Sequence, residues 1–171
     1  MSQQADALAS AHQTLFSKGL EMRNKVVGKA YVDKALAAGS SDYARPMQEY
    51  VTEACWGSIW GRPGLELKTR SLLNLAMLCA LNRSTELGVH TRGALSNGAS
   101  EVEIRETILQ AACYCGMPAG VEGFKVTERV INEWKAEHGI TGPVLGNSKK
   151  AGHETPVADV DVGERMNLEN I

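Results

Sequence analysis

The stretch "KTRSLLNLAMLCAL", residues 68–81, decides the fold class. Its Leu, Ala, Met and Cys residues cover more than half of the surface of a helix, so this helix should be buried at the centre of the protein. Outward from it, apolar residues recur at spacings of three and four along almost the whole chain, and strand-like alternation is absent. The sequence therefore predicts an all-α domain.

Further helices are predicted on both sides of this segment. Residues 3–20 and 21–39 predict two helices, the second ending at Gly39, and the sequence "SSD" with Pro46 predicts the start of a third that runs toward Trp60. The next helix is predicted at residues 83–97. Ser100 and Glu103 predict a capping box, and the last helix is predicted at residues 119–137. We expect one domain at 1–138 and an extended tail at 139–171, either disordered or wrapped around a neighbouring subunit.

The composition excludes several classes of protein. The chain has 171 residues with 43% hydrophobic and 5% aromatic residues, enough for one core of Leu, Ala, Val and Ile. The net charge of −2 offers no basic excess for phosphate contacts, so we expect no nucleic-acid partner. We find no secretory signal and no apolar run of about 20 residues, and therefore expect no membrane partner and a cytoplasmic protein.

Four cysteines, Cys55, Cys79, Cys113 and Cys115, lie in apolar, helix-like segments. None forms a CxxC pair, and no histidine accompanies them at the spacing of metal ligands. We expect free, buried thiols and no metal site.

The stretch "RSTELGVHTRGALSN", residues 83–97, carries the candidate chemistry. Arg83, Glu86 and His90 are three and four residues apart, which places them on one face of a helix. A cation, a carboxylate and an imidazole on one stripe form an acid–base arrangement, although an exposed face with a Glu–His pair has the same spacing. If Ser84 caps this helix, Glu86 lies in the first turn, where the helix dipole favours a carboxylate.

Arg70 opens the central helix, where a cation is unfavourable for the helix dipole. Such a placement indicates an anionic partner, either a protein carboxylate or a ligand. Trp56 and Trp60 are four residues apart and are expected to anchor the end of the third helix before the Gly/Pro loop.

The long block "RPGLELKTRSLLNLAMLCALNRSTELGVHTRGALSNGASEVEIRETILQAACYCGMPAG" resembles the carboxymuconolactone decarboxylase family, within the wider alkylhydroperoxidase D-like fold. The upstream blocks "RNKVVGKAYVDKAL" and "CWGSIWGRPG" resemble the decarboxylase branch of that family. The resemblance implies an all-α subunit in a homo-oligomer, a trimer or a hexamer. The peroxidase branch carries a CxxC pair followed four residues later by His; His90 matches that His, while Arg83 and Glu86 occupy the thiol positions. Thiol–disulfide cycling therefore lacks its two thiols here.

The resemblance also implies a reaction. The family removes CO2 from 4-carboxymuconolactone, a small anionic lactone of aromatic-compound catabolism in the β-ketoadipate pathway, and gives 3-oxoadipate enol-lactone without a cofactor. Electrons move onto the lactone carbonyl to form a dienolate, which is then protonated. Such an enzyme needs hydrogen-bond donors where the oxyanion forms and a positioned acid.

By this resemblance we assign roles to six residues. His90 is the expected proton donor or oxyanion partner, because its unperturbed pKa lies near neutrality, and Glu86 orients and charges it. The guanidinium groups suit the substrate carboxylates. The catalytic candidates are His90, Glu86 and Arg83; the substrate-binding candidates are Arg70, Arg62 and Trp60.

Three alternatives stay open from the sequence. The same site can act as a lyase or isomerase on another carboxylated lactone or enol in secondary metabolism, because a fold does not determine a substrate. A thiol peroxidase is disfavoured because Arg83 and Glu86 occupy the thiol positions. A non-catalytic oligomer is disfavoured because Arg70, Arg83, Glu86 and His90 are all present.

The placement of Glu122 also stays open. Its side chain either enters the cavity or lies in solvent at a helix N-terminus.

Overall fold

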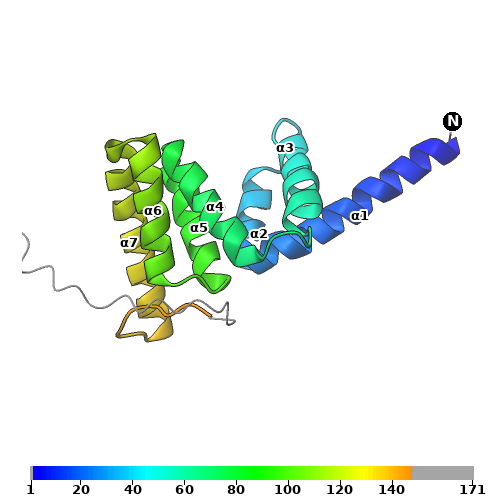
Figure 1. The fold of residues 1–171 in the computed structure, drawn as a ribbon. Coiled ribbons are helices and arrows are strands. Elements are labelled where there is room, and N and C mark those ends of the chain that lie inside the picture. Colours follow the sequence, from blue (N-terminus) through cyan, green and yellow to red (C-terminus); the bar gives the residue numbers. More distant parts are fainter. Residues whose placement is uncertain (1, 148–171) are drawn as a thin grey trace, which may run out of the picture.

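The computed structural model describes residues 2–147, and throughout that range the regular structure is helical (Figure 1). The all-α prediction is confirmed. The elements are α1 (Ser2–Val27), α2 (Lys29–Ala38), α3 (Arg45–Tyr50), the π-helix η1 (Val51–Trp60), α4 (Leu67–Ala80), α5 (Ser84–Ser96), α6 (Glu101–Cys115) and α7 (Met117–His138). None of these helices has the length and apolar character needed to cross a membrane.

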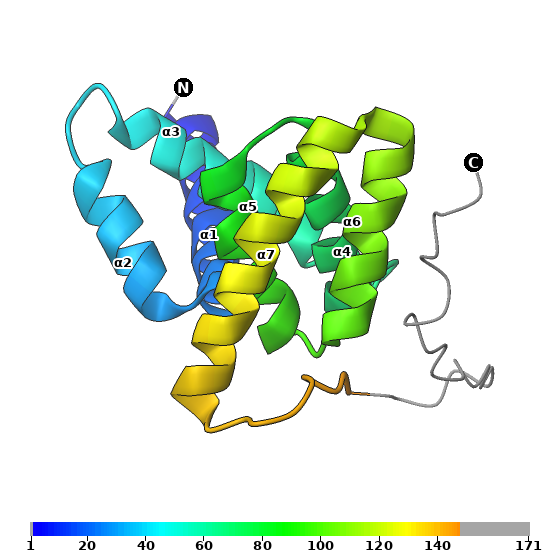
Figure 2. The same ribbon diagram turned by 90° about the vertical axis from the view of Figure 1, so that its left-hand side faces the viewer.

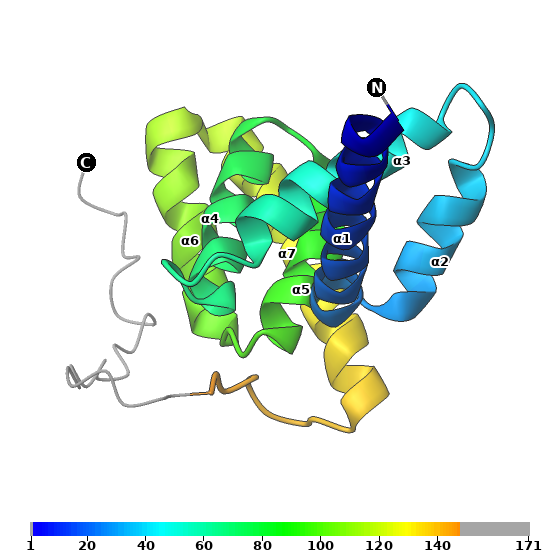
Figure 3. The ribbon, with the colours of Figure 1, turned by 90° about the vertical axis from the view of Figure 1, so that its right-hand side faces the viewer.

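The helices form two packed groups (Figures 2 and 3). Helices α4, α5, α6 and α7 pack together around a core that includes Leu75, Leu87, Ile104 and Ile108. Leu75 and Cys79 of α4 are buried in this core, whereas Leu73 and Met77 on another face of the helix are exposed, so α4 is less buried than its composition predicts. Helix α1 packs along η1 and reaches the other group through α5, and the N-terminal part of α1 extends away from the body (Figure 1).

A second core joins α1, α2 and η1. It contains the buried residues Val26, Val27, Val32, Trp56 and Trp60. This core lies beside α5, since Val89 packs against it. The interface between the two groups therefore contains the His90 turn of α5.

Two glycines let α1 and η1 approach until their backbones touch. A Cβ on Gly19 would lie 2.0 Å from the Thr52 carbonyl oxygen, and one on Gly57 would lie 2.5 Å from the carbonyl oxygen of Leu15. Larger residues at these positions are therefore excluded by backbone atoms. The crossing places Thr52 against the next turn of α1, which carries Arg23.

The boundary between the first two helices differs from the prediction. Helix α1 continues through residue 20 to Val27, and the break comes at Gly28, where φ is +86°. Glycine adopts this conformation without the steric cost that a side chain brings. The predicted end of the second helix at Gly39 is confirmed.

Other predicted helix ends can be compared directly. Ser100 and Glu103 form the predicted capping box of α6. Ser84 is the first residue of α5 and not its cap; Arg83 holds the N-cap position, without a side-chain cap. The third predicted helix begins at Arg45 with Pro46 in its first turn and continues as the π-helix η1, which the apolar pattern did not reveal.

The prediction that all four cysteine thiols are buried is only partly confirmed. Cys79 is buried and Cys55 is half-buried, whereas Cys113 and Cys115 are exposed. The residues of α6 that face the core are Ile104, Ile108, Ala111 and Ala112. Cys113 lies on another face, and Cys115 lies in the last turn before Gly116, so neither meets the core.

Residues 140–147 follow α7 without regular structure. Val144 packs against the main core, and its carbonyl accepts a hydrogen bond of 3.0 Å from the Glu101 N–H. The Asn147 N–H donates to the Gly98 carbonyl at 3.1 Å. This part of the predicted tail runs back along the start of α6; residues 148–171 lie outside the described residues.

Candidate active site

A cavity of about 170 Å³ lies where α1, η1, α4 and α5 meet. Its charged and polar lining includes Arg23 on α1, Asn74 on α4, and Glu86 and His90 on α5. Tyr31 of α2 and the residues Cys55 and Trp56 of η1 also line the cavity. Glu86 and His90 were predicted to share a face, and the structure brings both to this cavity. Segments more than 60 residues apart in the sequence thus contribute to one site.

His90 is half-buried beside two indole rings. The Trp56 and His90 rings are nearly parallel, at 6°, with centroids 6.0 Å apart, and the Trp60 ring lies 6.2 Å away. The two indoles stack on each other at 4.9 Å. Both come from η1, and π-helical segments occur frequently at functional sites. Trp60, a predicted substrate-binding residue, stacks with the imidazole but does not line the cavity, whereas Trp56 does both.

Asn74 determines which nitrogen of His90 carries the proton. Its side-chain nitrogen lies 3.3 Å from His90 Nδ1. An amide nitrogen can only donate, so Nδ1 accepts this hydrogen bond and the proton of the neutral ring is on Nε2. Sequence reasoning had assigned the orienting role to Glu86. Among residues 2–147 no hydrogen bond joins Glu86 to His90.

Burial lowers the pKa of His90, and the negative charge of Glu86 opposes this effect without cancelling it. Removing the ring from water disfavours the charged imidazolium. His90 is therefore a neutral imidazole at neutral pH, with Nε2–H as its hydrogen-bond donor.

Arg23 is the cation of this cavity, and the sequence analysis did not select it. Only 6% of the residue is exposed. Its Nη1 donates hydrogen bonds to Gln48 Oε1 at 3.1 Å and to Thr52 Oγ1 at 3.2 Å. A sequence signal existed: Arg23 shares a helix face with Gly19, Val26 and Val27, so a charge stands on an apolar stripe.

The three arginines selected from the sequence lie elsewhere. Arg83 is exposed, and its backbone N–H donates to the Leu78 carbonyl at 2.9 Å. Arg62 is exposed in the loop after η1, and its carbonyl accepts a hydrogen bond of 3.0 Å from the Arg70 guanidinium. None of the three lines the His90 cavity. Arg70 thus donates to a backbone carbonyl, while its buried Nε has no hydrogen-bond partner among the described residues, and the predicted anionic partner of Arg70 stays a prediction.

Glu122 is also outside this cavity. It is exposed on α7, and one of its carboxylate oxygens accepts a hydrogen bond of 3.3 Å from the Ser84 hydroxyl. Of the two placements left open for Glu122, the structure shows the solvent-facing one.

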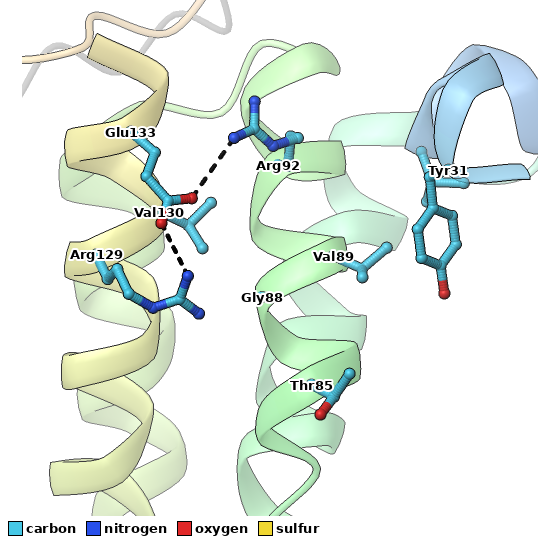
Figure 4. A pocket seen from close by; sticks show the side chains of 9 residues that line it. Tyr31, Thr85, Gly88, Val89, Arg92, Arg129, Val130 and Glu133 are labelled. Carbon is cyan, nitrogen blue, oxygen red and sulfur yellow. Dashed lines mark hydrogen bonds and ion pairs between the residues drawn. The ribbon is translucent and has the colours of Figure 1, made fainter. Parts of the chain in front are cut away.

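A larger cavity of about 400 Å³ shares Val27, Tyr31 and Val89 with the first (Figure 4). Its cations are paired with carboxylates: Arg129 donates to Glu133 at 2.9 Å, and Arg92 makes two hydrogen bonds to Glu137. These pairs neutralise the guanidinium groups of the outer cavity. Within the described chain, Arg23 has no carboxylate oxygen within 4.0 Å, so the inner cavity is the better place for an anion.

Comparisons with known proteins show which proteins the chain resembles. The chain is 47% identical over 122 residues to a nitrosuccinic acid decarboxylase of Metarhizium robertsii, covering 71% of this chain and 85% of the relative. It is 36% identical over 118 residues to a 4-carboxymuconolactone decarboxylase of Acinetobacter baylyi, covering 69% and 87%. Both relatives are decarboxylases, which supports a carboxy-lyase. Residues 45–129 match the carboxymuconolactone decarboxylase family model. The chain belongs to the carboxymuconolactone decarboxylase family.

Proposed function

We propose that this protein removes CO2 from a small dicarboxylate whose leaving carboxylate is attached next to an electron-withdrawing group, with nitrosuccinate as the first candidate. The observation that carries the proposal is the cavity shared by a neutral imidazole and a buried guanidinium. The identity of 47% to a nitrosuccinic acid decarboxylase supports the choice of substrate.

The chemistry needs one bond to break and one proton to be added. In nitrosuccinate the bond between the nitro-bearing carbon and its carboxylate breaks, and the electron pair moves into the nitro group to form a nitronate. A proton then adds to the same carbon. Nitrosuccinate dianion and one proton thus give 3-nitropropanoate and CO2, with no change of oxidation state that would call for an electron carrier.

His90 has the properties of an oxyanion partner for this step. Its neutral ring presents Nε2–H as a donor, and Asn74 keeps it in that tautomer. The indoles of Trp56 and Trp60 limit water around it, so a hydrogen bond to the developing nitronate oxygen is stronger than it is in bulk solvent. Removing one such donor typically lowers kcat by about 10²–10³-fold.

Glu86 is placed to deliver the proton. It is exposed to solvent and also lines the cavity, so its carboxyl group connects bulk water with the bound carbanion. In this proposal it takes a proton from water and passes it to carbon after CO2 has left. The negative charge of Glu86 also raises the pKa of His90. This effect supports the predicted role of Glu86 in charging the imidazole.

4-Carboxymuconolactone is the second candidate, favoured by the 36% identical relative. The electron flow is equivalent, because the pair moves through a double bond onto the lactone carbonyl and His90 meets a dienolate oxygen instead of a nitronate. The predicted homo-oligomer, a trimer or a hexamer, is part of either proposal. Light scattering coupled to gel filtration measures that assembly.

The test is CO2 release from each substrate by the wild type, by His90→Gln and by His12→Gln. His12 is an exposed histidine that pairs with Glu53, so its variant is the matched control. We expect release from nitrosuccinate by the wild type and the control, and a loss of about 10²–10³-fold in His90→Gln. Full turnover by His90→Gln contradicts the assigned role, and no release from either substrate contradicts the proposed function.

A further inference from the structure

Arg23 is a buried arginine, whereas Arg70, whose guanidinium also donates to a neutral oxygen, is only half-buried. The Arg23 side chain is buried, yet its hydrogen bonds go to the neutral oxygens of Gln48 and Thr52. A buried guanidinium normally pairs with a carboxylate, because burying an uncompensated charge is costly. Arg92 in the neighbouring cavity shows the ordinary arrangement, with Glu133 and Glu137 as its partners.

The neutral partners orient the guanidinium and leave its charge uncompensated. Thr52 is completely buried, and its hydroxyl donates to the Gln48 carbonyl at 2.7 Å, so it is itself held in place. Where α1 and η1 cross at Gly19, the backbone of Thr52 lies against α1. Burial lowers the pKa of Arg23, and the smaller effects of Tyr31 and Cys55 oppose this shift. The fold thus holds a buried cation at the wall of the His90 cavity.

From this placement we infer that Arg23 binds the carboxylate that the substrate keeps. The inference rests on the proposed decarboxylation and adds which group selects the substrate. A planar guanidinium suits a carboxylate, and its attraction is strong where water is limited. The retained carboxylate is anchored at Arg23, while the carboxylate that leaves lies away from this cation, because a cation that stabilised it would oppose loss of CO2.

This role makes Arg23 the determinant of selectivity for dianions. Nitrosuccinate and 2-nitropropanoate share the reacting centre, a nitro group and a carboxylate on one carbon, but 2-nitropropanoate has a methyl group where nitrosuccinate has the second carboxylate arm. The wild type should therefore prefer nitrosuccinate strongly in kcat/KM. Removing one partner of a buried, hydrogen-bonded charge pair weakens binding substantially. We therefore expect kcat/KM for the dianion to change on the order of 100-fold when Arg23 is truncated.

The activity experiment compares the two substrates with the wild type, Arg23→Gln, Arg23→Lys and Arg105→Gln. Arg105 is exposed on α6 and pairs with Glu106, so its variant is the matched control. Arg23→Gln should lower kcat/KM for nitrosuccinate on the order of 100-fold and leave 2-nitropropanoate nearly unchanged, with Arg23→Lys between the two. An unchanged ratio between the substrates in Arg23→Gln overturns the inference.

A binding experiment separates this inference from the proposed function. Succinate is a dianion that cannot react, and its binding is measured by the rise in Tm that it causes. Succinate should raise the Tm of the wild type and of Arg105→Gln but not that of Arg23→Gln, even if no decarboxylation is found. The Tm without ligand should be equal or higher in Arg23→Gln, because a costly buried charge is removed. A succinate-induced rise that persists in Arg23→Gln, or unliganded Arg23→Gln and Arg23→Lys proteins that are both strongly destabilised, means a structural role and overturns the inference.

Discussion

Replacing Asn74 with Asp should reverse the hydrogen-bond polarity at His90. The Asn74 side-chain nitrogen donates to Nδ1 across 3.3 Å, which keeps the proton of the neutral ring on Nε2. A carboxylate at this place accepts from Nδ1–H and carries a negative charge. Opposite charges 3.3 Å apart interact by about 5 kcal/mol at an effective dielectric of 20. Solvent at a half-buried pair reduces this to about 1–3 kcal/mol, so the pKa of His90 should rise by about 1–2 units.

The assay has two readouts. Nitrogen-15 NMR of the imidazole follows the tautomer and the pKa of His90, and CO2 release against pH follows the reaction. In the wild type the rate should be maintained down to the ordinary histidine pKa of about 6.5 and fall only at lower pH, because burial lowers the pKa of His90 and the neutral ring is the active form. In Asn74→Asp the neutral ring loses its Nε2–H, so the rate should fall as the pH increases above the raised pKa. An unchanged tautomer and an unchanged pKa in the variant would refute the reasoning, and Asn74→Ser is the uncharged control.

Three further results are expected. In Glu86→Gln the pKa of His90 should fall further and turnover should slow with little change in KM; an NMR titration that shows the pKa rising contradicts this. In Gly19→Ala the new Cβ meets the Thr52 carbonyl at 2.0 Å, so urea unfolding should show a loss of about 1–3 kcal/mol; unaltered stability rejects the close crossing. Because the pKa of His90 is lowered in the folded state, its contribution to the free energy of unfolding is complete above about pH 6.5 and is lost as the pH falls below that value. Urea titrations should show this slope in the wild type and not in His90→Gln; equal slopes mean that His90 is not buried as a neutral ring.

The fold class could be predicted because the three-and-four spacing of apolar residues extends through most of the chain. The ends of helices were harder to predict where one residue type is compatible with two different structures. Gly19 can end a helix or allow close packing within one, and the choice depends on Thr52 and Gly57, far along the chain. The π-helical hydrogen bonding of residues 51–60 could not be predicted from the sequence, since those residues are also compatible with an ordinary α-helix.

The site was only half predictable for a related reason. Glu86 and His90 lie on continuous helix, so their spacing places them on one face. Arg83 has the right spacing, but its backbone is not helical (φ −98°, ψ 68°), and the stripe ends before it. Arg23 was missed because its partners Gln48 and Thr52 are 25 and 29 residues away, and only the tertiary crossing shows that its charge is buried.

The central claim is that the cavity between α1 and α5 receives the anionic substrate. The most direct measurement is a crystal structure with bound succinate. The account predicts one carboxylate within hydrogen-bonding distance of the Arg23 guanidinium and the rest of the molecule directed toward the His90 ring. Succinate bound at Arg62, Arg70 or Arg83, with the cavity beside His90 empty, would contradict it.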